Sequence, residues 1–155
     1  MKTLIACYSF TGNTSKVAES LKEATGADFT RIEPVKDANY LMKCLSALFK
    51  RRTPIKPCAT DLKGYDAVIV CSPVWADSVP AAINQYIDEL KGCEGKKFGI
   101  IVTYGSTGQN RVSGQIMAAL EKKKMTFIDS IWVTQDEARA GDYAEKVKQL
   151  AAELN

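Results

Sequence analysis

Residues 3–25, TLIACYSFTGNTSKVAESLKEAT, place an apolar run, a polar turn and an amphipathic segment in direct succession. The run Thr3–Tyr8 predicts a buried β-strand, and apolar residues recur at the spacing of one helix face over residues 17–24. The turn between them, residues 9–14, is SFTGNT. This stretch therefore predicts a strand, a tight turn and a helix, which together begin a β–α–β unit.

The same alternation continues along the chain. Further apolar or β-branched runs predict strands at Phe29–Ile32, Ala67–Cys71, Phe98–Thr103 and Thr126–Val133. Apolar residues at helical spacing predict helices over residues 41–48, 79–90, 112–120 and 143–154, with Ser78 as an N-cap. Strands that are apolar throughout are typical of a parallel sheet covered on both faces. The sequence predicts a three-layer α/β sandwich with a five-stranded parallel sheet, in a single domain over residues 1–155.

The composition excludes several classes of function. The chain has no histidine, so it cannot hold a Ser-His-Asp triad, a Cys-His pair or an HExxH metal site. Its 5 cysteines are odd in number and contain no CxxC spacing, which predicts no zinc site and favours a reducing, cytoplasmic compartment. No run of about 18 apolar residues is present, so no membrane span is expected.

A short basic cluster contributes to a net charge of +3. Residues 43–58 contain no acidic side chain and hold the cations Lys43, Lys50, Arg51, Arg52 and Lys56. A nucleic-acid reader usually carries a basic face over much of a domain, so one such cluster does not predict nucleic-acid binding. A solvated helix end is one explanation of this cluster.

The turn after the first strand is a predicted anion site. The first amides of a helix lack internal partners, and the helix dipole adds partial positive charge there. Gly12 permits close approach of the backbone, and hydroxyl groups line the turn. Capping by the same residue types is the alternative explanation. Neither GxxxxGK[ST] nor GxGxxG is present, and the predicted phosphate ligands are Ser9, Phe10, Thr11, Gly12, Asn13 and Thr14.

The motif SFTGNT resembles the Ser/Thr-x-Thr-Gly-x-Thr loop with which flavodoxins hold the 5′-phosphate of FMN. The likeness covers the whole chain, since residues 65–88 and 96–108 are similar to the third and fourth flavodoxin strands with their loops. The resemblance implies FMN as the cofactor and the sheet order 2-1-3-4-5. It also implies a ligand site at the carboxyl ends of the strands.

The resemblance further implies a clamp for the flavin ring. Trp75 is expected at the surface, stacked against the ring, although a buried position is the alternative for any tryptophan. Trp132, inside the fifth predicted strand, is assigned to packing. The residues expected to hold the ring are Ser72, Pro73, Val74, Trp75, Ala76 and Asp77 on one loop, and Thr103, Tyr104, Gly105, Gly108 and Gln109 on the other.

Three features depart from the flavodoxin pattern. Ala76 stands where the family usually has glycine, and residues 105–110 contain no aromatic side chain to cover the outer face of the ring. The net charge is positive, whereas electron-carrying flavodoxins are typically acidic. An open outer face suits hydride transfer from a small substrate. The basic cluster would guide either an acidic redox protein or the 2′-phosphate of NADPH.

The leading expectation is a flavodoxin-type electron-transfer protein with FMN, in monomeric or weakly dimeric form. An NAD(P)H-dependent flavin or quinone reductase on the same fold is the alternative. A flavin-free signalling or interaction domain is a further alternative. The response-regulator version of that alternative lacks its phospho-acceptor, because the third strand ends in Cys71-Ser72 rather than in aspartate.

Overall fold

The computed structural model describes residues 1–36, 39, 41–42, 45 and 52–155. The predicted helix over residues 41–48 falls largely outside these residues. The cations Lys43, Lys50 and Arg51 also lie outside them.

The described residues form one 5-stranded sheet in the order β2-β1-β3-β4-β5, and every neighbouring pair is parallel. This confirms the predicted fold and strand order. The predicted strand bounds are close, although the third, fourth and fifth strands run further toward their carboxyl ends. The strands are β1 Thr3–Cys7, β2 Asp28–Arg31, β3 Ala67–Pro73, β4 Lys97–Tyr104 and β5 Thr126–Thr134.

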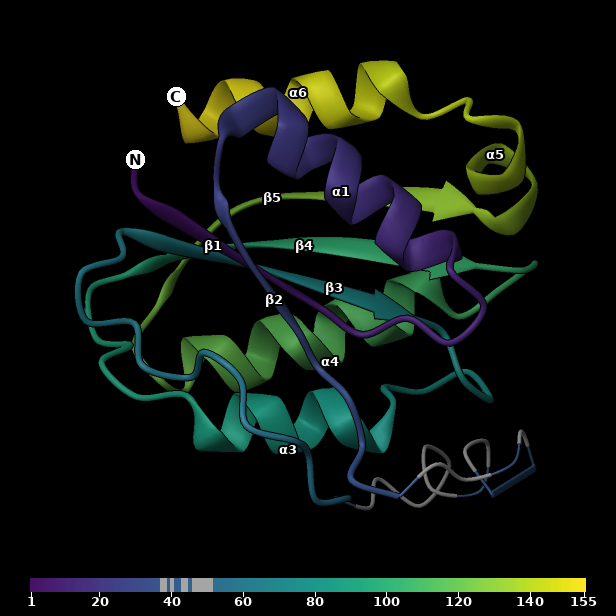
Figure 1. Ribbon diagram of the computed structural model, residues 1–155, viewed down its shortest axis with the longest axis horizontal. Helices are drawn as coiled ribbons and strands as arrows, with labels where there is room; N and C mark the ends of the chain where they lie inside the picture. Colours follow the sequence, from purple (N-terminus) through teal and green to yellow (C-terminus); the bar gives the residue numbers. More distant parts are fainter. Residues whose placement is uncertain (37–38, 40, 43–44, 46–51) are drawn as a thin grey trace.

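Helices cover both faces of the sheet, as Figure 1 shows. One face carries α1 and α6, and the other carries α3 and α4. Apolar side chains of each helix pair fill the space against the sheet, for example Leu21 and Leu150 on one face and Ile83 and Ile116 on the other. The helices are α1 Asn13–Thr25, α3 Ala81–Glu89, α4 Gln109–Glu121, α5 Gln135–Ala140 and α6 Ala144–Leu154.

Burial follows the position of each strand in the sheet. The residues of β1 are all buried, as are those of β3 up to Ser72, whereas β2 and most of β5 are only partly covered because they lie at the edges. Trp132 on β5 is partly buried against the core under α3 and α4, as predicted. None of the helices in the described part of the chain is long and apolar enough to cross a membrane.

Two helix starts differ from the sequence expectation. α3 begins at Ala81 with Pro80 as its N-cap, so the prediction that Ser78 caps this helix is wrong. The Ser78 backbone instead exchanges two hydrogen bonds with Trp75. The short helix α5 was not predicted, although Thr134 and Glu137 form a capping box at its start. That Thr-x-x-Glu spacing was the available sequence signal.

Candidate functional site

Three loops meet at the carboxyl edge of the sheet because β1, β3 and β4 are neighbours. The backbone joins them closely: the Tyr8 N–H donates to the Cys71 carbonyl at 3.1 Å, and the Val74 N–H donates to the Thr103 carbonyl at 3.0 Å. The sequence-predicted phosphate turn and the two predicted ring loops therefore lie side by side. In Figure 1 these loops are at the right, where the strand arrows end.

The phosphate turn leaves the start of α1 open. Gly12 is the N-cap, with φ +91°, and no side chain in the described structure caps this helix end. Ser9 Oγ accepts the Gly12 N–H at 3.2 Å, which closes the turn. A Cβ built on Gly12 would meet nothing within 4 Å. The first amides of α1 thus lack a side-chain cap in the described structure, and with no acidic residue in the first turn the turn fits a phosphate group.

Thr14 contributes a different contact from the one expected. Its hydroxyl lies 2.6 Å from the Thr103 hydroxyl, and the residue is only 2% exposed. The bond joins the start of α1 to β4. The predicted role of Thr14 as a direct phosphate donor stays a prediction.

The expectation that Trp75 lies at the surface is wrong, because the residue is only 5% exposed. Trp75 and Ser78 pair backbone to backbone in a tight turn, which returns the chain and packs the indole against the core. The rings of Phe10 and Trp75 lie 5.4 Å apart between centroids. Phe10 is 44% exposed, so it is the aromatic side chain of this pair that a ligand can reach.

The turn after Trp75 carries backbone strain. Ala76 and Asp77 have φ of 45° and 58°, in the left-handed region. Turns with positive φ at both central residues favour Gly, Asn and Asp, and an alanine there costs roughly 1–2 kcal/mol. Such strain gathers at ligand-binding loops.

Replacing Ala76 by glycine is expected to stabilise the fold by about 0.5–1 kcal/mol, because glycine adopts positive φ without a clashing Cβ. Urea unfolding measures the change. The control is Ala118→Gly on the exposed side of α4, which should destabilise by about 1 kcal/mol. Destabilisation by Ala76→Gly of that same size would contradict the strain.

The two ring loops touch through Gly108. A Cβ on Gly108 would lie 2.5 Å from Asp77 Oδ1 and 2.6 Å from Val74 Cγ1, so only glycine fits this contact. The sequence did not single out Arg111, whose Nη1 lies 3.6 Å from Asp77 Oδ2. The sequence feature that could have identified Arg111 is its position in the first turn of α4, where the helix dipole disfavours a positive charge.

Cys7 and Cys71 lie below these loops as register partners on β1 and β3. Burial and the neighbouring Cys7 raise the pKa of the Cys71 thiol well above its ordinary value. A protonated, buried thiol is a poor nucleophile. Among the described residues, no group of three His, Cys, Asp or Glu side chains could hold a metal ion.

The two described cations of the basic cluster lie in different surroundings. Arg52 pairs with Asp88 of α3, on the outer side of the helix layer. Lys56 pairs with Glu33 at 3.1 Å and lines a hollow together with Phe10. Lys56 therefore borders the phosphate turn.

The family model of NADPH-dependent FMN reductases matches residues 1–140. The chain belongs to this family. Membership confirms FMN as the flavin that the sequence predicts, and agrees with the flavodoxin-like strand order. No curated protein matches the sequence.

Solved structures with the same fold include flavoproteins and flavodoxins. A flavoprotein of Bacteroides uniformis ATCC 8492 aligns with a TM-score of 0.76 at 24% identity, over 96% of each chain. A flavoprotein of Lactobacillus acidophilus NCFM in complex with FMN gives 0.74 at 20% identity, over 92% of this chain and 98% of that one. The two-electron reduced flavodoxin of Megasphaera elsdenii gives 0.66 at 18% identity, over 97% and 96%.

Proposed function

We propose that this FMN reductase family member is an FMN-dependent oxidoreductase that takes electrons from NAD(P)H without a second protein. One observation carries the choice: the loop after β4 presents only small, exposed residues over 105–107. No bulky side chain of this loop covers the outer face of a ring held beside it, so a nicotinamide has access. The family to which the chain belongs supports the same choice.

The chain's own residues bind and orient the cofactor. The uncapped amides at the start of α1, with the hydroxyls of Ser9 and Thr11, would hold the phosphate. Phe10, backed by Trp75, would supply apolar contact to the ring, and the exposed backbone around Gly105 would approach its polar edge. When bound, FMN would supply the redox chemistry: it accepts a hydride and then passes the two electrons to an acceptor.

Steady-state turnover tests the proposal. FMN-loaded protein with NADPH and a quinone is expected to oxidise NADPH with no other protein present. FMN-free protein is the control. The proposal fails if the protein retains FMN, and dithionite reduces that FMN, but NADPH is not consumed.

A flavodoxin-type electron carrier is the second candidate. It is favoured by the shared fold and by the cations Arg52 and Lys56, which would attract an acidic redox partner. A carrier would be reduced only through such a partner, and its reduction would slow with added salt. Cytoplasmic location and a monomeric or weakly dimeric state stay predictions.

A further inference from the structure

A cavity of about 330 Å³ lies on the β2 side of the phosphate turn. Its lining includes Ser9 and Phe10 from the turn, Ile32 and Glu33 after β2, and Lys56 from the following segment. None of the predicted ring-loop residues 72–77 and 103–109 lines it. Small-molecule sites span about 300–1,000 Å³, so this one accommodates a ribose with its phosphate rather than a whole dinucleotide.

Backbone hydrogen bonds fix the charged wall of this cavity. The Ile32 N–H donates to the Cys7 carbonyl at 2.9 Å, which extends the β1–β2 pairing to the cavity floor. The Lys56 N–H donates to the Glu33 carbonyl at 2.8 Å. Glu33 and Lys56 are therefore held at set positions, whereas their side chains remain 52% and 57% exposed.

The Lys56–Glu33 ion pair leaves the ammonium available to a ligand. The two charged atoms lie 3.1 Å apart, but at this exposure such a pair is weak. A phosphate carries more negative charge than Glu33 and would compete well for the Lys56 ammonium. Glu33, for its part, would accept a hydrogen bond from a ribose hydroxyl.

Phe10 connects this cavity to the predicted ring site. Its ring lies 5.4 Å from that of Trp75, which heads the turn of the first ring loop, and the same side chain lines the cavity. A ligand spanning the two places would pass Phe10. The dinucleotide-binding doubly wound fold, whose glycine fingerprint this chain lacks, uses the same two chemistries: an acidic side chain binds a ribose 2′-hydroxyl, and a nearby cation accommodates a 2′-phosphate.

We propose that this cavity binds the phosphorylated ribose at the adenosine end of the nicotinamide dinucleotide, with Lys56 binding the 2′-phosphate of NADPH. The assignment rests on the proposed function. Glu33 acts in the opposite sense, because its carboxylate repels a 2′-phosphate and accepts a 2′-hydroxyl. The preference between NADPH and NADH is therefore set by these two side chains.

Calorimetric titration of FMN-loaded protein tests this, with 2′,5′-ADP and 5′-AMP as probes that carry and lack the 2′-phosphate. Lys56→Gln is expected to weaken 2′,5′-ADP about ten-fold, the effect of losing one charge-assisted hydrogen bond, and to leave 5′-AMP unchanged. Glu33→Gln is expected to strengthen 2′,5′-ADP. A loss of local structure would weaken 2′,5′-ADP binding in both variants, so affinity changes of opposite sign would show that the two charges act directly on the ligand.

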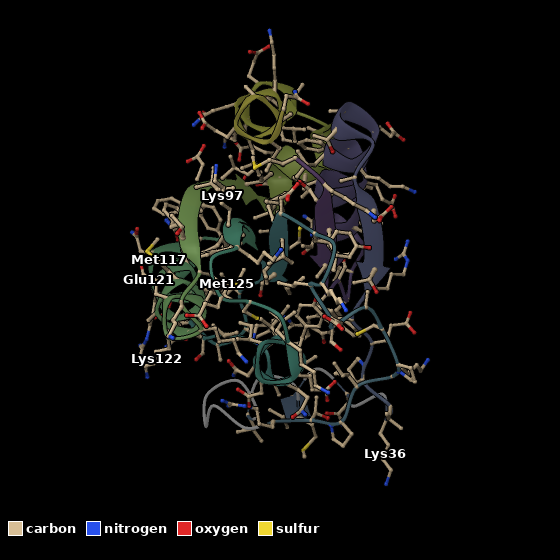
Figure 2. The ribbon with its side chains drawn as sticks, turned by 90° about the vertical axis from the view of Figure 1, so that its left-hand side faces the viewer. Lys36, Lys97, Met117, Glu121, Lys122 and Met125 are labelled. Carbon is tan, nitrogen blue, oxygen red and sulfur yellow. The ribbon has the colours of Figure 1, made fainter. Side chains whose placement is uncertain are left out.

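Lys97→Gln is the matched control, since it removes the same charge elsewhere. Lys97 begins β4, at the end of the sheet remote from the loops, and Figure 2 faces that end. Equal 2′,5′-ADP affinity in the Lys56→Gln and Lys97→Gln variants would overturn the assignment.

Kinetics separate the two levels of the proposal. Lys56→Gln should raise KM for NADPH without changing KM for NADH. If the Lys56→Gln variant turns over NADPH with the same preference for NADPH over NADH as the wild type, the cavity assignment is overturned and the proposed function is not. Absence of turnover in the wild-type protein overturns the proposed function.

Discussion

The Gly12→Asp variant is expected to lose FMN, with Kd raised more than about a hundred-fold. An aspartate here would project into the open space at the start of α1, where the phosphate is proposed to lie. Two like charges about 4 Å apart near a protein surface repel by roughly 4 kcal/mol, and each 1.4 kcal/mol is ten-fold in affinity. Flavin fluorescence quenching, titrated against the FMN-free protein, measures the change.

Two controls isolate the charge. Gly12→Asn has nearly the same size and tolerates positive φ, so its FMN affinity should fall far less. Gly26→Asp places the same side chain at the other end of α1, at φ +67° with nothing within 4 Å of the Cβ. It should leave Kd unchanged. Equal losses in the Gly12→Asp and Gly12→Asn variants would mean that no anion binds at this turn.

The Gly108→Ala variant is expected to be destabilised by about 2–4 kcal/mol in urea unfolding. The φ of +95° contributes roughly 1–2 kcal/mol, and the contacts of the new Cβ with Asp77 and Val74 add the cost of an overpacked site. Because those contacts push apart the two predicted ring loops, FMN affinity should fall as well.

Gly141→Ala separates strain from crowding. Gly141 has φ +76° and open space around its Cβ, so its replacement should cost only the roughly 1–2 kcal/mol of strain. In an Asp77→Ala background, Gly108→Ala should be less destabilising, and therefore closer to Gly141→Ala, because Asp77 Oδ1 is the nearest atom to the new Cβ. Equal destabilisation at Gly108 and Gly141 would contradict the close contact of the loops.

The sheet was predictable because its signals are local and repeated. Apolar runs such as Ala67–Cys71 alternate with segments whose apolar residues recur at helical spacing, and the short crossovers between parallel strands then restrict the topology. The phosphate turn was predictable for a similar reason, since Ser9–Thr14 carries its small and polar residues in one continuous stretch. The strand order came from the resemblance rather than from these patterns.

The burial of Trp75 depends on features that local pattern does not carry. The turn that buries it has positive φ at Ala76 and Asp77, and alanine is not one of the residues that favour such a turn. The pairing of Lys56 with Glu33 joins segments 23 residues apart, and the contact of Gly108 with Asp77 joins two separate loops. Such contacts arise only once the sheet has brought the loops together.

The short bond between the hydroxyls of Thr14 and Thr103 ties the phosphate end of the site to the ring end. The two parts of the predicted FMN site are thus hydrogen-bonded to each other before any ligand arrives. Much of the entropy of arranging them is lost during folding rather than on association. Binding of FMN would then require little reorganisation of the polypeptide. A molecule that has only the phosphate or only the ring of FMN would also meet a preformed site.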